Sequence, residues 1–226
     1  MTVESAARNS DSPFVKSIAR TICHASGSFR VVPDGSWDIL VIKHHDFSRV
    51  LVTGALTRPI FSVNEVGDEL LCISFKPGVY SPYLLPQVLR DRSVRTGSSN
   101  GRSFGIFNES FEIPDFENAD DFVNRLYRCE FLTVDELVSS RCTGDPIAAS
   151  LRSIQRHFLK STGLTLNFYQ QLERAKKAEK LLRQGCAAAD AAFEAGFTDQ
   201  PHMINSLKAI LGQTPTEITG KNQSAG

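Results

Sequence analysis

Residues 187–212 read AAADAAFEAGFTDQPHMINSLKAILG and predict two helices that meet at a turn. The first segment is rich in alanine, the strongest helix former, and Gly196 ends it because glycine readily adopts a left-handed backbone. Asp199 then caps a second helix, whose apolar residues recur at helical spacing at Met203, Leu207 and Ile210. Two helices joined by the three residues GFT indicate a helix-turn-helix, in which the second helix can enter a DNA major groove.

A second helix with the same features lies upstream, in the sequence SLRSIQRHFLKSTG at residues 150–163. Ser150 is a favourable N-cap, and Thr162-Gly163 predicts the end of the helix. The spacing of its apolar residues predicts that three of them face inward, namely Leu151, Ile154 and Phe158. This helix is preceded by the segment DELVSS, so a second helix-turn-helix with a longer connection is expected.

A long helix, from about Asn167 to Arg183, joins the two motifs. Its inward positions are Phe168, Leu172, Ala175, Ala178 and Leu182, and Gly185 ends it. We expect favourable charge pairs one turn apart between Glu173 and Lys177 and between Glu179 and Arg183. Thr214-Pro215-Thr216-Glu217 has the pattern of a capping box and predicts a short final helix.

Helices are also predicted before residue 150. Asn118 or Asp120 can cap a helix that carries Phe122 and Val123 on one face. Thr133-Val134-Asp135-Glu136 also has the capping-box pattern, so a helix is expected to begin there. From residue 118 onward the chain is therefore predicted to be helical throughout, with short turns.

The first half of the chain has the pattern of strands instead. Five short runs rich in β-branched and aromatic residues are separated by turn residues such as Pro33-Asp34-Gly35-Ser36. These runs are SFRVV (28–32), WDILVI (37–42), RVLVTG (49–54), PIFSV (59–63) and ELLCISF (69–75). Their spacing of roughly ten residues predicts a small antiparallel sheet or barrel. Residues 95–103, RTGSSNGRS, indicate a loop.

Charge is unevenly distributed along a chain whose formal net charge is zero, with 25 basic and 25 acidic residues. Residues 1–130 hold 14 basic and 16 acidic residues, and the remainder holds 11 and 9. Residues 150–186 alone hold eight basic residues against two acidic ones. Such a local excess is typical of a phosphate-binding surface, although a solvated helical face explains it equally well.

The remaining composition indicates an ordinary globular protein of 226 residues, of one or two domains, with 41% hydrophobic residues. The five cysteines are scattered without a C-x-x-C pair, which favours free thiols in a reducing compartment. The first residues carry no signal-peptide pattern, and no apolar run is long enough to span a bilayer. We therefore expect a soluble, cytoplasmic protein without a membrane partner.

Residues 150–217 closely resemble the DNA-binding domain of the AraC/XylS family of bacterial transcription regulators. The shared features are S-x-R-x-x-Q-R-x-F, the T-G step, L-x-R-x-x-x-A-x-x-L-L, G-F-x-D-Q-x-H and the closing G-Q-T-P. The first half, with F-R-V-V-P-D-G-x-W-D and F-K-P-G, resembles less closely the cupin-like sensory half of one branch of that family. The first of these two resemblances, at residues 150–217, covers about a third of the chain and is highly specific.

The resemblance implies that two recognition helices lie in successive major grooves. In the first helix, residues 150–161, Arg152, Gln155 and Arg156 would face the bases just after the Ser150 cap. Arginine can bind guanine and glutamine can bind adenine through paired hydrogen bonds. The expected phosphate contacts are Lys160, Lys176 and Lys177. An ion pair on the protein surface is the alternative role for Arg156.

The second recognition helix, residues 199–211, departs from the family pattern. Gln200 is in place, but Ile204-Asn205 stands where the family usually has Thr-Arg, and Pro201 removes a donor side chain. We expect Gln200 and Asn205 to contact DNA weakly, so that the first helix dominates specificity.

No catalytic or metal site is predicted. His44 and His45 are adjacent, so on a strand they would face opposite sides and could not bind one ion; they indicate a turn. Asp34, Trp37 and Asp38 could line a pocket, but a turn acid beside a core aromatic residue is the preferred interpretation. His202 matches the turn histidine of the family and is expected to be structural. We therefore expect neither enzymatic activity nor a cofactor.

These observations predict an α+β protein of two domains. Residues 1–116 would form a cupin-like β-barrel for sensing or oligomerisation, 117–130 a connecting helix, 131–220 a double helix-turn-helix, and 221–226 a flexible tail. The predicted function is that of a bacterial transcription regulator that binds specific sequences of double-stranded DNA at the nucleoid. One alternative is a degenerate regulator that acts through protein contacts or heterodimers without specific DNA reading, and another is a metal-free cupin-like enzyme. Further candidate partners are a small-molecule effector, RNA polymerase and a second copy of the chain.

Overall fold

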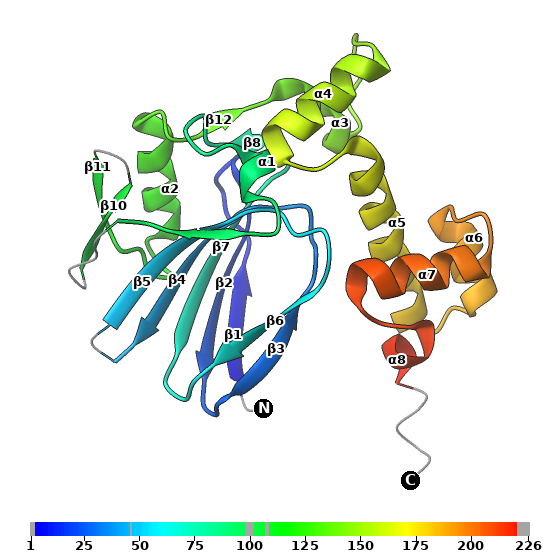
Figure 1. Ribbon diagram of the computed structural model, residues 1–226, viewed down its shortest axis with the longest axis horizontal. Coiled ribbons are helices and arrows are strands. Elements are labelled where there is room, and N and C mark those ends of the chain that lie inside the picture. Colours follow the sequence, from blue (N-terminus) through cyan, green and yellow to red (C-terminus); the bar gives the residue numbers. More distant parts are fainter. Residues whose placement is uncertain (1–2, 46, 98–101, 107–108, 221–226) are drawn as a thin grey trace.

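The computed structural model describes residues 3–45, 47–97, 102–106 and 109–220. Strands dominate the chain up to residue 112 and helices dominate it from residue 119 (Figure 1). The predicted α+β class is therefore confirmed. The predicted tail at residues 221–226, and residues 98–101 of the predicted loop, lie outside the described residues.

The largest element is a six-stranded antiparallel sheet with the order β1-β2-β7-β4-β5-β9. Its strands are β1 (Val3–Arg8), β2 (Val15–Cys23), β7 (Glu69–Phe75), β4 (Asp38–His44), β5 (Phe47–Thr53) and β9 (Ser93–Arg95). Three two-stranded sheets accompany it, formed by β3 (Gly27–Val31) with β6 (Ile60–Asn64), β8 (Val79–Tyr80) with β12 (Thr133–Val134), and β10 (Ser103–Ile106) with β11 (Glu109–Glu112).

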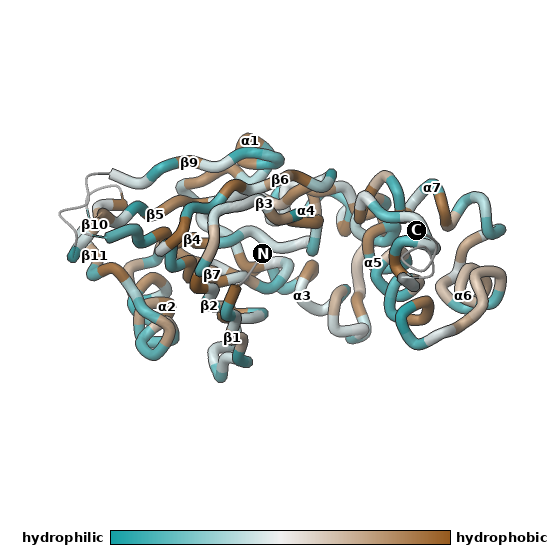
Figure 2. The backbone as a smooth tube through the Cα atoms, turned by 90° about the horizontal axis from the view of Figure 1, so that it is seen from below, coloured by the Kyte–Doolittle hydropathy of each residue, from teal (hydrophilic) through white to brown (hydrophobic). Residues whose placement is uncertain are grey.

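The first core forms where the sheet is covered by helix α2 (Ala119–Arg128) and the β10–β11 hairpin. Alternate residues of β4 and β7, such as Ile39, Val41 and Ile73, are buried against it. Phe122 of α2 packs against Phe104 and Phe111 of the hairpin. Figure 2 shows hydrophobic stretches in the central strands and also along the helices of the elongated molecule.

All five predicted strands are confirmed as β3, β4, β5, β6 and β7. The pattern of strand-forming runs did not predict β1 and β2, although β2 pairs with both β1 and β7 in the large sheet. A register shift between Val15 and Ser17 interrupts the two-residue alternation that would have revealed β2. His44 ends β4 and His45 lies in the following turn, as expected.

The C-terminal half contains two helical cores on one continuous helix. Its helices are α3 (Glu136–Thr143), α4 (Leu151–Thr162), α5 (Leu166–Arg183), α6 (Ala188–Ala195), α7 (Gln200–Leu211) and α8 (Pro215–Thr219). Val138, Ile154, Phe158 and Leu166 form the smaller core. Leu172 and the later apolar residues of α5 form the larger core with α6, α7 and α8. Across the described ranges, no helix combines the length and apolar character needed to cross a bilayer.

Two predictions about the helices of this half, one about a start and one about an inward face, are wrong. Thr133-Val134 does not begin a helix but pairs with β8, so the chain is not helical throughout from residue 118. Asp135 is the actual N-cap of α3, and its side chain accepts a hydrogen bond from the Val138 N–H. Leu151 does not face inward either. It is 63% exposed, because only the middle and last turns of α4 are buried.

Candidate DNA-binding surface

Helix α4 presents three of the predicted base-contacting side chains together. The Ser150 hydroxyl accepts a hydrogen bond from the Ser153 N–H at 3.2 Å, which fixes the start of the helix as predicted. Ile154 and Phe158 are buried on one face. The side chains of Arg152, Gln155 and Arg156 are exposed on the helix near its N-terminus. Positions three and four residues apart lie on one helical face, so these side chains can act together on one groove.

A contact that sequence reasoning missed fixes the orientation of α4. The His157 Nδ1 lies 2.8 Å from Oδ2 of Asp135, and the other oxygen of this carboxylate caps α3. Asp135 is buried, so this pair ties the two helices of the first helix-turn-helix together. Nothing in the sequence spacing indicated it, because the partners lie 22 residues apart.

Helix α7 has the same construction with a different outer face. Asp199 accepts a hydrogen bond from the His202 N–H at 2.7 Å, and Met203, Leu207 and Ile210 are buried as predicted. Gln200 and Asn205 are exposed, whereas Ile204 is partly buried. The His202 ring packs edge-on against Phe197 at 5.4 Å, which agrees with a structural role. The exposed face of α7 therefore carries amides but no arginine.

Arg174, whose role the sequence did not predict, helps to hold α6 and α7 against the long helix α5. The guanidinium of Arg174 on α5 lies over the Phe197 ring, 5.6 Å from its centre. Phe197 belongs to the turn at residues 196–199, between α6 and α7. Cation–π packing of this kind fixes the turn relative to α5. Arg174 thus supports the second helix-turn-helix rather than adding an exposed charge.

The three lysines predicted to contact phosphate have different neighbours in the structure. Lys160 is exposed, and its ammonium group lies 6.0 Å from the centre of the Tyr80 ring. Lys176 donates to the Asp34 carbonyl oxygen at 2.7 Å and to Glu173 at 3.0 Å. Lys177 donates to the Glu194 carbonyl oxygen, so the expected Glu173–Lys177 pair is wrong. The expected Glu179–Arg183 pair is confirmed, at 2.7 Å.

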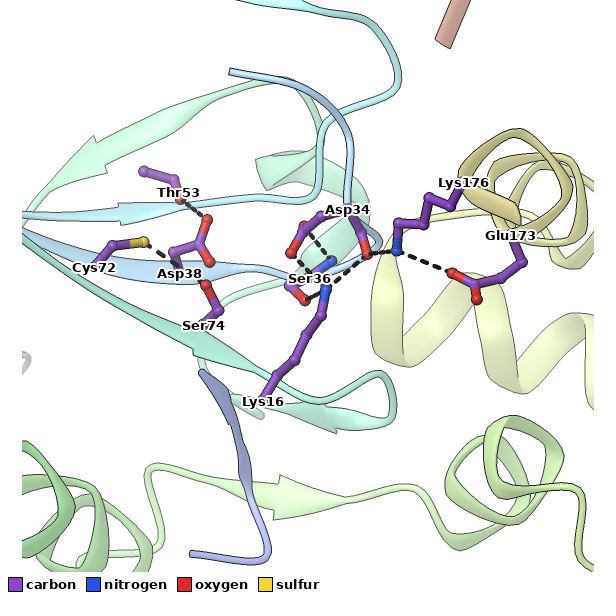
Figure 3. A network of polar contacts seen from close by, with 9 residues as sticks. All are labelled: Lys16, Asp34, Ser36, Asp38, Thr53, Cys72, Ser74, Glu173 and Lys176. Atoms are coloured by element: carbon purple, nitrogen blue, oxygen red, sulfur yellow. Dashed lines mark hydrogen bonds and ion pairs between the residues drawn. The ribbon is translucent and has the colours of Figure 1, made fainter. Parts of the chain in front are cut away.

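Asp34 is the centre of a polar network between the two halves of the chain (Figure 3). Lys16 donates to its carboxylate at 2.6 Å, and the Ser36 N–H donates to the other oxygen at 2.9 Å. Desolvation opposes ionisation of this carboxyl group. The charge and hydrogen bond of Lys16, the Ser36 hydrogen bond and the charge of Lys176 outweigh it, so the pKa of Asp34 is lowered.

The neighbouring residues agree with the preferred interpretation of this segment. Trp37 is a core residue that stacks on Phe75 at 4.1 Å and donates to the Val79 carbonyl oxygen at 2.7 Å. Asp38 accepts a hydrogen bond from Thr53 at 3.2 Å. Desolvation, followed by the negative charge of Asp34, raises the pKa of Asp38 to about 6. Among the described residues, no three His, Cys, Asp or Glu side chains gather as a metal site would require.

The sequence of the C-terminal helices matches known proteins. Residues 145–221 match a family model described as a helix-turn-helix domain. Residues 145–221 are therefore a helix-turn-helix domain, as the resemblance in the sequence predicted. The matched residues cover about a third of the chain, the same third on which the resemblance in the sequence rests.

Two curated relatives match this domain. One is an uncharacterized HTH-type transcriptional regulator, YbfI, of Bacillus subtilis, 40% identical over 33% of this chain and 28% of the relative. Another is the HTH-type transcriptional activator RhaS of Escherichia fergusonii, 34% identical over 45% of this chain and 37% of the relative. The match thus spans well under half the length of these relatives.

One solved structure aligns with nearly the whole chain. It is ToxT from Vibrio cholerae, which covers 97% of this chain and 98% of its own, with a TM-score of 0.42 at 11% identity. That level of similarity supports no argument about the site. The candidate base-facing residues are instead argued from the side chains that α4 and α7 expose.

Proposed function

We propose that this chain is a transcription regulator that binds double-stranded DNA, with α4 as its dominant recognition helix. The observation that carries the proposal is the exposed set Arg152, Gln155 and Arg156, placed directly after the Ser150 cap. In a helix-turn-helix the first residues of the second helix reach the base edges. The names of the curated relatives, all transcriptional regulators, support this reading.

The proposal assigns different roles to the other predicted site residues. Gln200 and Asn205 would contact DNA from α7 without the paired hydrogen bonds that an arginine makes to guanine. Lys160 would contact phosphate directly. Lys176 and Lys177 would do so only after leaving Asp34 and Glu194, to which they are bound in this structure.

We further propose the division of labour expected from the sequence. Residues 1–116 would form a sensory or oligomerisation domain, residues 117–130 the connecting helix and residues 131–220 the DNA-binding domain, with no catalytic role for any of them. A small-molecule effector, RNA polymerase and a second copy of the chain are the candidate partners of the first domain. Action on DNA would place the chain at the nucleoid.

Selection of bound fragments from a random DNA pool tests the central proposal. A consensus should emerge, and its affinity should fall as salt rises, because bound phosphates release counterions. The R156A variant should then lose about 1–3 kcal/mol of discrimination at one base pair. R141A is the matched control, since Arg141 is exposed on α3 outside the recognition helix.

Two outcomes would contradict the proposal. Absence of any consensus, or affinity that does not change with salt, would favour the alternative regulator that acts through protein contacts alone. An unchanged consensus in R156A would show that α4 does not read that base pair, and would leave Arg156 as a surface residue.

A further inference from the structure

The N-terminal half contacts the C-terminal end of each recognition helix. The first contact is at Gly163, the residue that caps α4. A Cβ placed on Gly163 would lie 2.4 Å from the Pro86 carbonyl oxygen, so the two backbones are in direct contact. Pro86 begins the short helix α1 (Pro86–Leu89). Arg90 Nη1 also donates to the Gly163 carbonyl oxygen at 3.3 Å.

The second contact is at Gly212, the residue that caps α7. A Cβ placed there would lie 3.1 Å from the Pro59 side chain and 3.6 Å from that of Arg30. The charge of Arg30 also contributes to lowering the pKa of Glu217 on α8, after the hydrogen bonds that Glu217 accepts from Thr214. A proline and an arginine of the N-terminal half thus lie at each recognition-helix cap.

The third contact lies between these two, on helix α5. The side chains at positions 169, 172 and 176 form one stripe of this helix, and all three meet the turn at residues 33–36. Gly35 has a φ of 82°, and a Cβ on it would lie 2.9 Å from the Tyr169 ring. The turn therefore fits against α5 only because residue 35 has no side chain.

These contacts matter because little else fixes the two helix-turn-helix units relative to each other. Their cores are separate, and α5 is the element that contributes to both. The N-terminal half instead spans α4, α5 and α7, as Figure 1 shows for α1 beside α4 and for the β3–β6 ribbon on the side of α7. A rigid body attached at three points restrains bending and twisting of the single connecting helix.

The contacts also leave the base-facing side chains free. They touch the C-terminal caps of α4 and α7, whereas Arg152, Arg156 and Gln200 lie in the first two turns of these helices and are exposed. Docking therefore restrains the two helices without covering their reading faces. We propose that the N-terminal half acts as a brace that sets the separation of the two recognition helices, through the contacts at Gly163, α5 and Gly212.

A distance measurement tests the brace without using DNA. A ketone-bearing amino acid is introduced at position 141 on α3 and at position 189 on α6, both of which are exposed, and each ketone carries a spin label. This chemistry does not react with the five cysteines. The full chain should give one narrow distribution of label distances, and R30A/R90A should broaden it. R49A/R92A is the control, because it removes the same charge from two other exposed arginines of the N-terminal half.

A backbone variant provides a second, stronger disruption. Gly163 and Gly144 are both left-handed helix caps, with φ of 75° and 85°, but only Gly163 faces Pro86. G163A should therefore broaden the distribution and G144A should not. If neither R30A/R90A nor G163A broadens it, the N-terminal half does not set the separation and the proposal is overturned.

The consequence for DNA rests on the proposed function. With the DNA chosen by selection, R30A/R90A should bind more weakly than both the wild type and R49A/R92A. Tighter binding by R30A/R90A would mean that docking blocks DNA, and would overturn the brace. If the wild type binds no DNA, the proposed function fails, while the distance measurement still decides whether the brace exists.

Discussion

Asp38 and Asp34 show how two carboxyl groups four residues apart acquire opposite properties. Lys16 and the Ser36 N–H stabilise the charged form of Asp34, whose pKa is lowered. Asp38 is desolvated beside this negative charge, and hydrogen bonds from Ser74 and Thr53 compensate only in part, so its pKa rises to about 6. The folded protein therefore holds a proton on Asp38 more tightly than the unfolded chain does.

The first prediction concerns D38N and the pH dependence of stability. A raised pKa means that the wild type loses stability as pH rises from about 4 through 6, the window between the unfolded and folded pKa values. Asparagine carries no charge to desolvate. D38N should therefore be more stable than the wild type at pH 8, by about 1–3 kcal/mol given partial solvent access.

Urea unfolding between pH 4 and pH 8 measures this difference. The stabilities of D38N and wild type should converge toward pH 4, and D190N, at an exposed aspartate of α6, should follow the wild type throughout. A gap between D38N and wild type that stays constant across the pH range would mean that Asp38 does not titrate in this window.

At the scale of elements, the outer face of α7 departs from the AraC/XylS pattern that residues 150–217 otherwise resemble. Ile204 and Asn205 replace a Thr-Arg pair, while the capping Asp199 and the buried Met203 and Leu207 are retained. The cap and the buried side of the helix therefore match the pattern, and the differences lie at the exposed Asn205 and the partly buried Ile204. Restoring the pair should act on DNA binding and leave the fold of α7 as it is.

The second prediction is that I204T/N205R binds DNA more tightly than the wild type. The added arginine should steepen the dependence of log affinity on log salt by about 0.9 if it meets a phosphate. If it meets a guanine, it should add about 1–3 kcal/mol of discrimination at a new base pair. Fluorescence titration over a salt series, with K208R as a control that adds no charge, distinguishes these cases. Unchanged binding would place α7 away from DNA.

The sequence predicts elements best where a local pattern and the final packing agree. The Ser150 and Asp199 caps and the Thr214–Glu217 capping box are confirmed, because a cap is decided within four residues. Thr133-Val134 failed because distant pairing with β8 overrides the local cap signal. The same limit hid the His157–Asp135 pair and the Lys176–Asp34 contact, whose partners are brought together only by the tertiary fold.

For the whole molecule, the zero net charge is an average over two differently charged halves. Residues 150–186 hold eight basic residues, and four of them are held within the protein by an acidic side chain, a backbone carbonyl oxygen or a buried ring. These are Arg174 over Phe197, Lys176 with Asp34, Lys177 with Glu194 and Arg183 with Glu179. The four exposed to solvent without an acidic partner are Arg152, Arg156, Lys160 and Lys180. The surface available to a polyanion is therefore smaller than the sequence suggests.

The last prediction follows from this count of available charges. Binding to random-sequence DNA should show a slope of log affinity against log salt of about −4, or about −5 if Lys208 on α7 also meets a phosphate. If all eight basic residues of 150–186 left their contacts within the protein and met phosphates, the slope would be about −7. K180A should make the slope shallower by about 0.9, because Lys180 is exposed. K177A, one turn away on α5, should leave it unchanged while Lys177 stays bound to Glu194. Equal effects of the two variants would show that the contacts made by the lysines of α5 within the protein give way when DNA binds.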